Sequence, residues 1–240
     1  MVNFPRIAAI AFLISTSLAA PVLAGHAKAS GGGGGGGGPI VAVATDYLHA
    51  KARDLKVMAV AVPYNAESAN GSAAIVRVDD GSDGGNPVCH LLMLAGKPSS
   101  PGKVESSVKF TVCPRADQGK DTLLSRVQMG GKRYAWQLRL STARYDAMAK
   151  GTEHSQHWAL VAEMGTGPQV VFERTSTTFK SPTDPATNQA EVCQAPIIKG
   201  ESEPESAEVT CDVEMMLGKL AKPTKPVFRY VWQGNRFFAQ

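Results

Sequence analysis

Two short polar segments hold the residue types that could bind a metal ion. In the first, Asp79-Asp80-Gly81-Ser82-Asp83-Gly84, Asp79 and Asp83 stand at positions one and five of a calcium-binding loop. Position twelve of such a loop is His90 rather than Glu, position three is Gly81, and no helices are evident on either side. A solvated turn is therefore the better interpretation.

His154 and His157 form the second candidate, in the segment Glu-His-Ser-Gln-His that directly precedes Trp158. Two histidines three residues apart could share a metal ion on a helix, but on an extended strand they point to opposite faces. No third ligand is evident. We therefore predict no metal site and no cofactor, and Asp79, Asp83, His154 and His157 are the candidates that this prediction sets aside.

The sequence lacks the motifs that supply a catalytic nucleophile. There is no Gly-x-Ser-x-Gly, and no Ser-x-x-Lys has convincing partners. The adjacent carboxylates of Asp79 and Asp80 would face opposite ways on a strand. His90 follows Cys89 in an expected strand and is interpreted as structural or exposed. We predict no catalytic residue, and enzymatic activity finds no support in the residues.

The pentapeptide Arg-Tyr-x-Trp-Gln occurs twice, at 133–137 and 229–233. Each copy follows two cysteines and the same order of apolar segments, so residues 57–140 and 158–240 are predicted to be copies of one unit. The four aromatic residues could form an exposed platform for carbohydrate or peptide. Their repetition in the closing strand favours core anchors instead. They are Tyr134, Trp136, Tyr230 and Trp232.

Four cysteines in an exported chain are typical of two disulfides. Of the three possible pairings, Cys89–Cys113 and Cys193–Cys211 give each copy the same internal bridge. Loops of this length would each contribute roughly 3 kcal/mol by restricting the unfolded chain. A zinc site is the alternative, but no Cys-x-x-Cys or His-x-x-x-His spacing supports it.

Alternation of apolar and polar residues predicts antiparallel strands with one packed face. Short helices are expected before each copy, at 45–56 with Thr45 as N-cap and at 142–150 ending before Gly151. The fold class is therefore mainly β (α+β): two tandem, disulfide-stapled antiparallel β domains related by internal duplication. The strands are expected at 57–62, 73–78, 88–89, 108–113 and 133–140, then at 158–162, 169–173, 192–193, 207–211 and 229–233.

The N-terminus has the pattern of a secretory signal, with one basic residue, an apolar run over 7–18 and Val-Leu-Ala before Gly25. The run is shorter than the roughly 20 residues that span a bilayer, so no stable membrane anchor is expected. We assign residues 1–24 to a signal peptide, 25–44 to a flexible glycine-rich tether, 45–141 to a first repeat domain and 142–240 to a second.

The formal net charge of +4 is too small to favour nucleic acid as a partner. Long polar loops, expected at 79–87, 97–103, 114–120, 181–189 and 201–206, are where binding contacts are commonly placed. We expect a periplasmic or extracellular, non-catalytic binding protein, an inhibitor or an envelope-interaction module, that contacts a protein or envelope component through these loops. A periplasmic hydrolase with an inter-domain site and a structural envelope protein are the alternatives.

Overall fold

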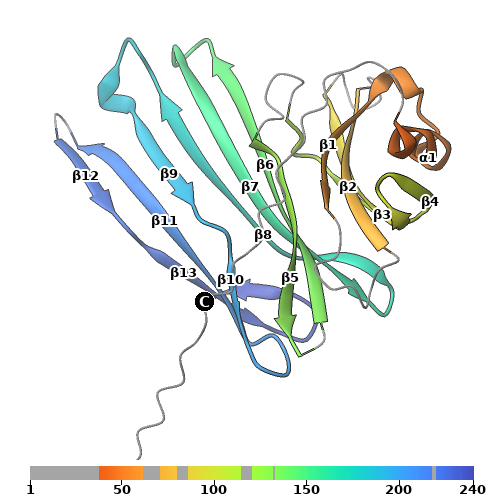
Figure 1. The fold of residues 1–240 in the computed structure, drawn as a ribbon. Coiled ribbons are helices and arrows are strands. Elements are labelled where there is room, and N and C mark those ends of the chain that lie inside the picture. Colours follow the sequence, from red (N-terminus) through yellow and green to blue (C-terminus); the bar gives the residue numbers. More distant parts are fainter. Residues whose placement is uncertain (1–37, 62–70, 80–85, 115–120, 132, 218–219) are drawn as a thin grey trace, which may run out of the picture.

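The structure, a computed structural model, describes residues 38–61, 71–79, 86–114, 121–131, 133–217 and 220–240. This part of the chain is mainly β: it has two antiparallel sheets, two disulfides and one α-helix (Figure 1). The mainly β class is therefore confirmed. The expected signal peptide and the glycine run lie outside the described residues, apart from Gly38.

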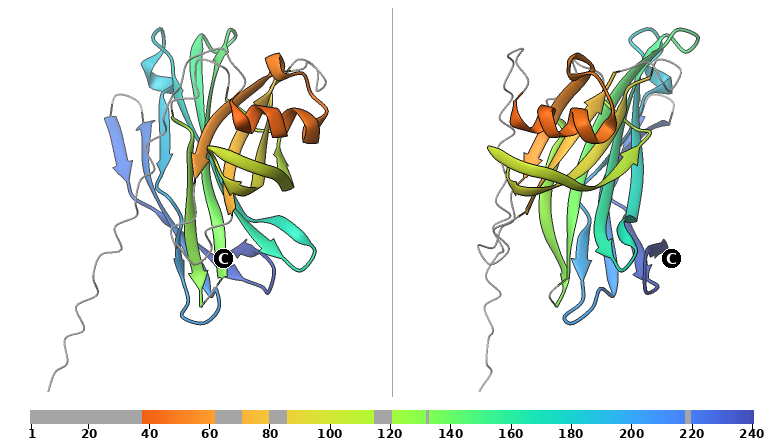
Figure 2. Two further views of the ribbon diagram at one scale, coloured as in Figure 1. Left: turned by 45° about the vertical axis from the view of Figure 1, so that its right-hand side comes forward. Right: turned by 90° about the vertical axis from the view of Figure 1, so that its right-hand side faces the viewer.

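The smaller sheet is an up-and-down arrangement of four strands, each paired to the next along the chain. Helix α1 (Pro39–Leu48) covers one of its faces, as Figure 2 shows from two sides. The other face packs against the larger sheet, which is why β2 is buried along nearly its whole length. The strands are β1 (Leu55–Ala61), β2 (Gly71–Val78), β3 (Val88–Lys97) and β4 (Ser100–Phe110).

The larger sheet has ten strands, in the order β14-β13-β11-β9-β8-β7-β6-β5, with β10 and β12 also paired to β11. Three consecutive strands of this sheet have 14 residues each. The strands are β5 (Leu123–Gly130), β6 (Arg133–Asp146), β7 (Gly151–Met164), β8 (Gly167–Lys180), β9 (Gln189–Cys193), β10 (Ile197–Lys199), β11 (Ser206–Leu217), β12 (Leu220–Thr224), β13 (Val227–Trp232) and β14 (Phe237–Ala239).

Strand β7 has one apolar cluster on each of its two faces. Ala159 and Val161 belong to the cluster shared with the smaller sheet. Leu160 points the other way, into a second cluster that includes Phe172 of β8 and Tyr230 of β13. The Phe172 ring lies 4.9 Å from the Tyr230 ring in an edge-to-face arrangement. The larger sheet therefore curls so that its two ends enclose the second cluster, as in Figure 1.

The turn between β5 and β6 approaches the segment between β10 and β11. The Gly131 N–H donates a 2.7 Å hydrogen bond to the carbonyl oxygen of Glu201. A Cβ atom on Gly130, where φ is +119°, would lie 2.7 Å from the carbonyl carbon of Glu203. Only glycine fits this approach without movement of the backbone. The contact closes the curled sheet at this end.

The helix lies earlier in the chain than expected. It begins at Pro39, which suits the first helical position, and ends at Leu48 before His49 in the left-handed region (φ 54°). Thr45 is therefore not an N-cap: its hydroxyl donates to the Val41 carbonyl oxygen inside the helix. Residues 39–44, which we assigned to the tether, are part of the helix, and β1 begins at Leu55 where the helix was expected to continue.

The helix expected at 142–150 is wrong. Residues up to Asp146 continue β6, and the rest form a turn. The Asp146 carboxylate accepts hydrogen bonds from the backbone N–H groups of Met148 (2.8 Å) and Ala149 (3.0 Å), and these bonds lower its pKa. An aspartate that satisfies the backbone in this way favours a turn over a helix. The loop expected at 97–103 is likewise mostly strand, because β3 and β4 meet there in a hairpin.

The boundary expected between 141 and 142 falls within β6, which pairs with β7 from Ala135↔Ala162 to Asp146↔Gly151. The closing strand of the first expected copy is thus hydrogen-bonded to the opening strand of the second. The duplication and the division into two domains stay predictions. In the described part of the protein no helix has the length and apolar character needed to cross a membrane.

Candidate functional site

Of the two calcium-loop candidates, Asp79 lies within the described residues. Asp79 follows β2 and forms an ion pair with Arg77, whose Nε donates to Asp79 Oδ2 at 2.9 Å. Arg77 is itself buried and also donates to the Pro114 carbonyl oxygen at 3.3 Å. Asp79 therefore helps to hold Arg77 between the end of β2 and the segment that contains Pro114. Asp83 lies outside the described residues.

The two histidines lie on opposite faces of β7, as their spacing on a strand predicts. His154 is exposed, whereas His157 is buried between the sheets with its Nδ1 atom 2.9 Å from the Thr175 hydroxyl. The Phe110 ring packs edge-on against His157 at 6.3 Å. Burial lowers the pKa of His157, and the nearby Glu173 carboxylate opposes this effect. The pair cannot bind one metal ion.

Both predicted disulfides are present, Cys89–Cys113 and Cys193–Cys211. Two disulfides are consistent with an exported protein. Glu191 lies close to Cys193 and Cys211, and the three form the one group of potential metal ligands found among the described residues. Because the two sulfur atoms are bonded to each other, neither is a thiolate that could bind a metal ion.

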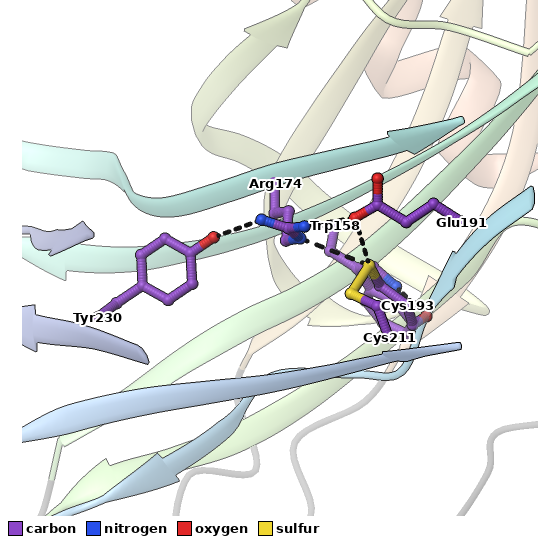
Figure 3. Close-up of a disulfide and its surroundings, with 6 residues drawn as sticks. All are labelled: Trp158, Arg174, Glu191, Cys193, Cys211 and Tyr230. Atoms are coloured by element: carbon purple, nitrogen blue, oxygen red, sulfur yellow. Dashed lines mark hydrogen bonds and ion pairs between the residues drawn. A yellow bond between two sulfur atoms is a disulfide. The ribbon is translucent and has the colours of Figure 1, made fainter. Parts of the chain in front are cut away.

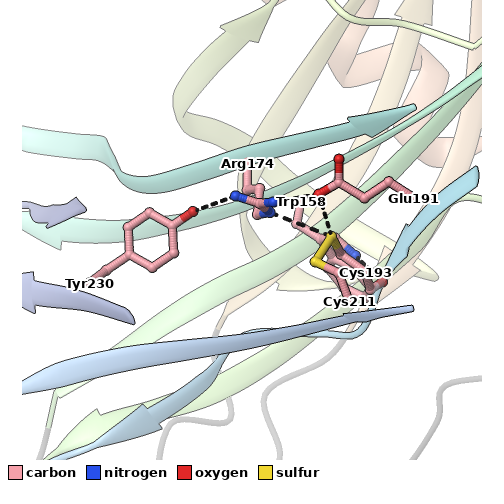
Figure 4. Close-up of polar contacts among 6 residues, drawn as sticks. All are labelled: Trp158, Arg174, Glu191, Cys193, Cys211 and Tyr230. Atoms are coloured by element: carbon pink, nitrogen blue, oxygen red, sulfur yellow. Dashed lines mark hydrogen bonds and ion pairs between the residues drawn. A yellow bond between two sulfur atoms is a disulfide. The ribbon is translucent and has the colours of Figure 1, made fainter. Parts of the chain in front are cut away.

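Arg174 on β8 joins several strands next to the second disulfide (Figures 3 and 4). Its guanidinium donates to the Tyr230 hydroxyl at 3.0 Å, forms an ion pair with Glu191, and lies 3.4 Å from Cys193 Sγ. The guanidinium carbon is 3.6 Å from the centre of the Phe228 ring. The protein itself supplies these partners, and the Arg174 side chain is only 16% exposed, so we interpret the group as structural.

A concave surface that encloses a volume of about 800 Å³ lies where the two sheets meet. Strands β2, β3 and β4 supply one wall, and β5, β6, the β7–β8 turn and the end of β13 supply the other. We call this surface the aromatic depression. Its aromatic and charged lining residues are Glu105, Arg126, Arg133, Tyr134, Trp136, Glu163 and Trp232.

Three of the four aromatic residues of the repeated motif line the aromatic depression. Trp136, from the first copy, and Trp232, from the second, are both half-buried, and so is Tyr134. Tyr230 instead is buried in the second apolar cluster. The four aromatic residues expected to be core anchors thus differ in position: one is inside, and three lie partly in contact with solvent.

Arg126 on β5 is held against two of these rings. Its guanidinium carbon lies 4.5 Å from the centre of the Tyr134 ring and 5.7 Å from that of Trp136. These distances are within the range of a cation–π interaction. On the other side, Trp232 packs edge-on against Phe237 at 5.0 Å. The rings are therefore fixed by neighbours on their own sheet and do not need a ligand to order them.

Comparison with known proteins brings no match. No protein-family model, no curated protein and no solved structure matches this chain.

Neither Arg126, which lines the depression, nor Arg174, which lies beside the second disulfide, was identified from the sequence. Strand β5 was not predicted, although its apolar Leu123, Val127 and Met129 alternate with the polar Arg126 and Gln128 at the period of a strand. Arg174 directly follows the strand predicted at 169–173, and its partners come from β9 and β13 and have no signal in the local sequence.

Proposed function

We propose that the protein is an exported, non-catalytic binding module that contacts an envelope or extracellular component at the aromatic depression. One observation carries the proposal. Trp136 and Trp232 stand at the same position of a motif that occurs twice in the chain. Both line one concave surface. Ligand sites are typically concave surfaces lined by aromatic side chains with a few polar groups.

The partial exposure of these rings supports binding over a role in packing alone. A tryptophan that serves only the core is normally enclosed, as Trp158 is: it is 5% exposed, and its indole N–H donates to the Cys193 carbonyl oxygen at 3.0 Å. Trp136 and Trp232 are instead half-buried: each packs on an apolar cluster and also lines the depression. Aromatic side chains that line a surface in this way are enriched where proteins bind partners.

The lining residues support binding without turnover. Among its described residues the depression contains no histidine and no cysteine. Its one serine, Ser72, is buried and donates its hydroxyl to the Gly96 carbonyl oxygen at 3.0 Å. Its hydroxyl therefore donates to a backbone oxygen, whereas a serine nucleophile donates to an adjacent base.

Contact through the polar loops stays a prediction, and one described loop is well ordered by its own hydrogen bonds. The backbone N–H of Ser181 donates to Asn188 Oδ1 at 2.7 Å, and the Ser181 hydroxyl donates to the Lys150 carbonyl oxygen at 3.2 Å. A loop fixed in this way can present side chains to a partner with little loss of entropy on binding.

The test is capture of components from the envelope fraction of the source organism on immobilised protein. Trp136→Ala and Trp232→Ala should each strongly reduce capture while the protein remains folded by circular dichroism. Tyr145→Ala is the matched control, because Tyr145 is an exposed aromatic residue on the same strand as Trp136 and outside the depression. Capture that survives both tryptophan substitutions would refute the proposal.

A further inference from the structure

Among the described residues that line the aromatic depression, the charges balance. Two arginines, Arg126 and Arg133, face two glutamates, Glu105 and Glu163. Arg133 is in addition paired with Glu203 at 3.1 Å. A surface without excess charge gives no long-range attraction for a polyanion or a polycation. The ligand that suits it is neutral and rich in hydrogen-bonding groups.

The aromatic residues of the depression suit a ligand that also has an apolar C–H face. The face of an aromatic ring carries partial negative charge and attracts the weakly positive C–H groups of an apolar surface. A pyranose ring has such a C–H face, and its edge is lined by hydroxyl groups. Trp136 and Trp232 can each stack on one sugar face, and carboxylate and guanidinium groups can bind hydroxyls through charge-assisted hydrogen bonds.

Arg126 is suited to bind a ligand hydroxyl because its guanidinium is already oriented. Its guanidinium rests on Tyr134 and Trp136, and a planar group held in this way loses little freedom when it donates to a ligand. Glu105 and Glu163 are exposed at the margin of the depression and add acceptors there. Donors and acceptors thus flank the stacking surfaces on the same concave face.

We propose that the aromatic depression binds a neutral oligosaccharide, with Trp136 and Trp232 as stacking platforms and Arg126, Glu105 and Glu163 as hydroxyl partners. The inference rests on the proposed function, since it names the ligand class of the same site. A volume of about 800 Å³ falls within the range of ligand sites and is open to a chain that extends beyond it.

The experiment is a titration of the purified protein with chitohexaose, laminarihexaose and maltohexaose, followed by tryptophan fluorescence and isothermal calorimetry. At least one of these should bind with an altered emission spectrum. Trp136→Ala and Trp232→Ala should each weaken binding by about tenfold, the loss expected when one stacked ring is removed. Trp136→Phe, which keeps a stacking ring, should retain most of the affinity, and Tyr145→Ala should bind like the parent.

Heparin serves as the polyanionic comparison. Binding of heparin that equals or exceeds that of the neutral hexasaccharides would overturn the inference, and so would an absence of binding by all three neutral hexasaccharides at millimolar concentration. If envelope capture still depends on Trp136 and Trp232 in that case, the proposed function stands and the ligand is of another class. If capture is also independent of both tryptophans, the proposed function fails as well.

Discussion

His157 should make the stability of the protein fall as the pH decreases below neutrality. The imidazole is buried between the two sheets, beside Phe110 and the Thr175 hydroxyl. Burial is the main cause that lowers its pKa below the ordinary value, and the charge of Glu173 acts in the opposite direction. The folded protein therefore keeps His157 neutral at pH values where the unfolded chain already binds a proton.

The sign and the size of the effect follow from proton linkage. Where the unfolded state binds more protons than the folded state, the free energy of unfolding rises with pH. The stabilisation from His157 is thus complete above the unfolded pKa of about 6.5 and is lost as the pH falls toward the lowered folded pKa. Between about pH 7.5 and about pH 5.5 the loss is at most ~1.4 kcal/mol, the value for one group that stays fully neutral in the fold.

Urea unfolding at several pH values measures this effect. His157→Gln should reduce stability at neutral pH, because it disturbs the packing against Phe110, but should flatten the pH dependence by up to the amount given above. His154→Gln is the control, since that side chain lies exposed on the opposite face of the same strand and should leave the pH dependence as in the parent. Equal slopes for the parent and His157→Gln would show that another group titrates and that the reasoning is wrong.

Three further changes test contacts that hold the fold. Gly130→Ala should lower the free energy of unfolding by about 2 kcal/mol or more, because its φ of +119° and the backbone of the facing segment both exclude a Cβ atom. Gly165→Ala, at which a Cβ atom meets nothing within 4 Å, should be nearly neutral in the same urea titration. Arg174→Met should lower the free energy of unfolding by about 1–3 kcal/mol, because it leaves the partly buried carboxylate and hydroxyl partners unpaired. Arg236→Met, which removes an exposed ion pair, should lower it by ~0–1 kcal/mol in parallel melts. Separate expression of residues 38–141 and 142–240 should yield chains without cooperative unfolding by circular dichroism, because the cut divides β6; two cooperative transitions would instead support a domain boundary at that point.

Features with a local signal could be predicted from the sequence. Strands have a local signal: the segment expected at 73–78 is an apolar run and is part of β2, and the one expected at 133–140 alternates and is part of β6. The disulfides Cys89–Cys113 and Cys193–Cys211 follow from the matching order of cysteines in the two halves. In each case the deciding information lies in a residue's type and its neighbours in the chain.

Features that depend on distant partners could not be predicted in this way. Thr45 resembles an N-cap, but the helix begins earlier, where Pro39 suits its first position and its apolar side can pack on the smaller sheet. The aromatic depression requires β6 and β13 to approach strands β2, β3 and β4 of the smaller sheet, and no local pattern states which sheet a strand joins. The motif identified Trp136 and Trp232 as a pair, but their common surface appears only in three dimensions.

The position of β6 explains why the two expected halves share one sheet. Its alternate residues are buried on both faces: Ala135 belongs to the cluster inside the curled sheet, and Leu138 and Leu140 belong to the cluster under the smaller sheet. A strand with one face open to solvent would leave one of these two sets of apolar residues exposed. The short turn at Asp146 places β6 directly beside β7, and pairing across such a turn loses little chain entropy. Burial on both faces and a short connection therefore favour the same partner for β6, and the strand that closes the first half of the sequence becomes part of the sheet built by the second.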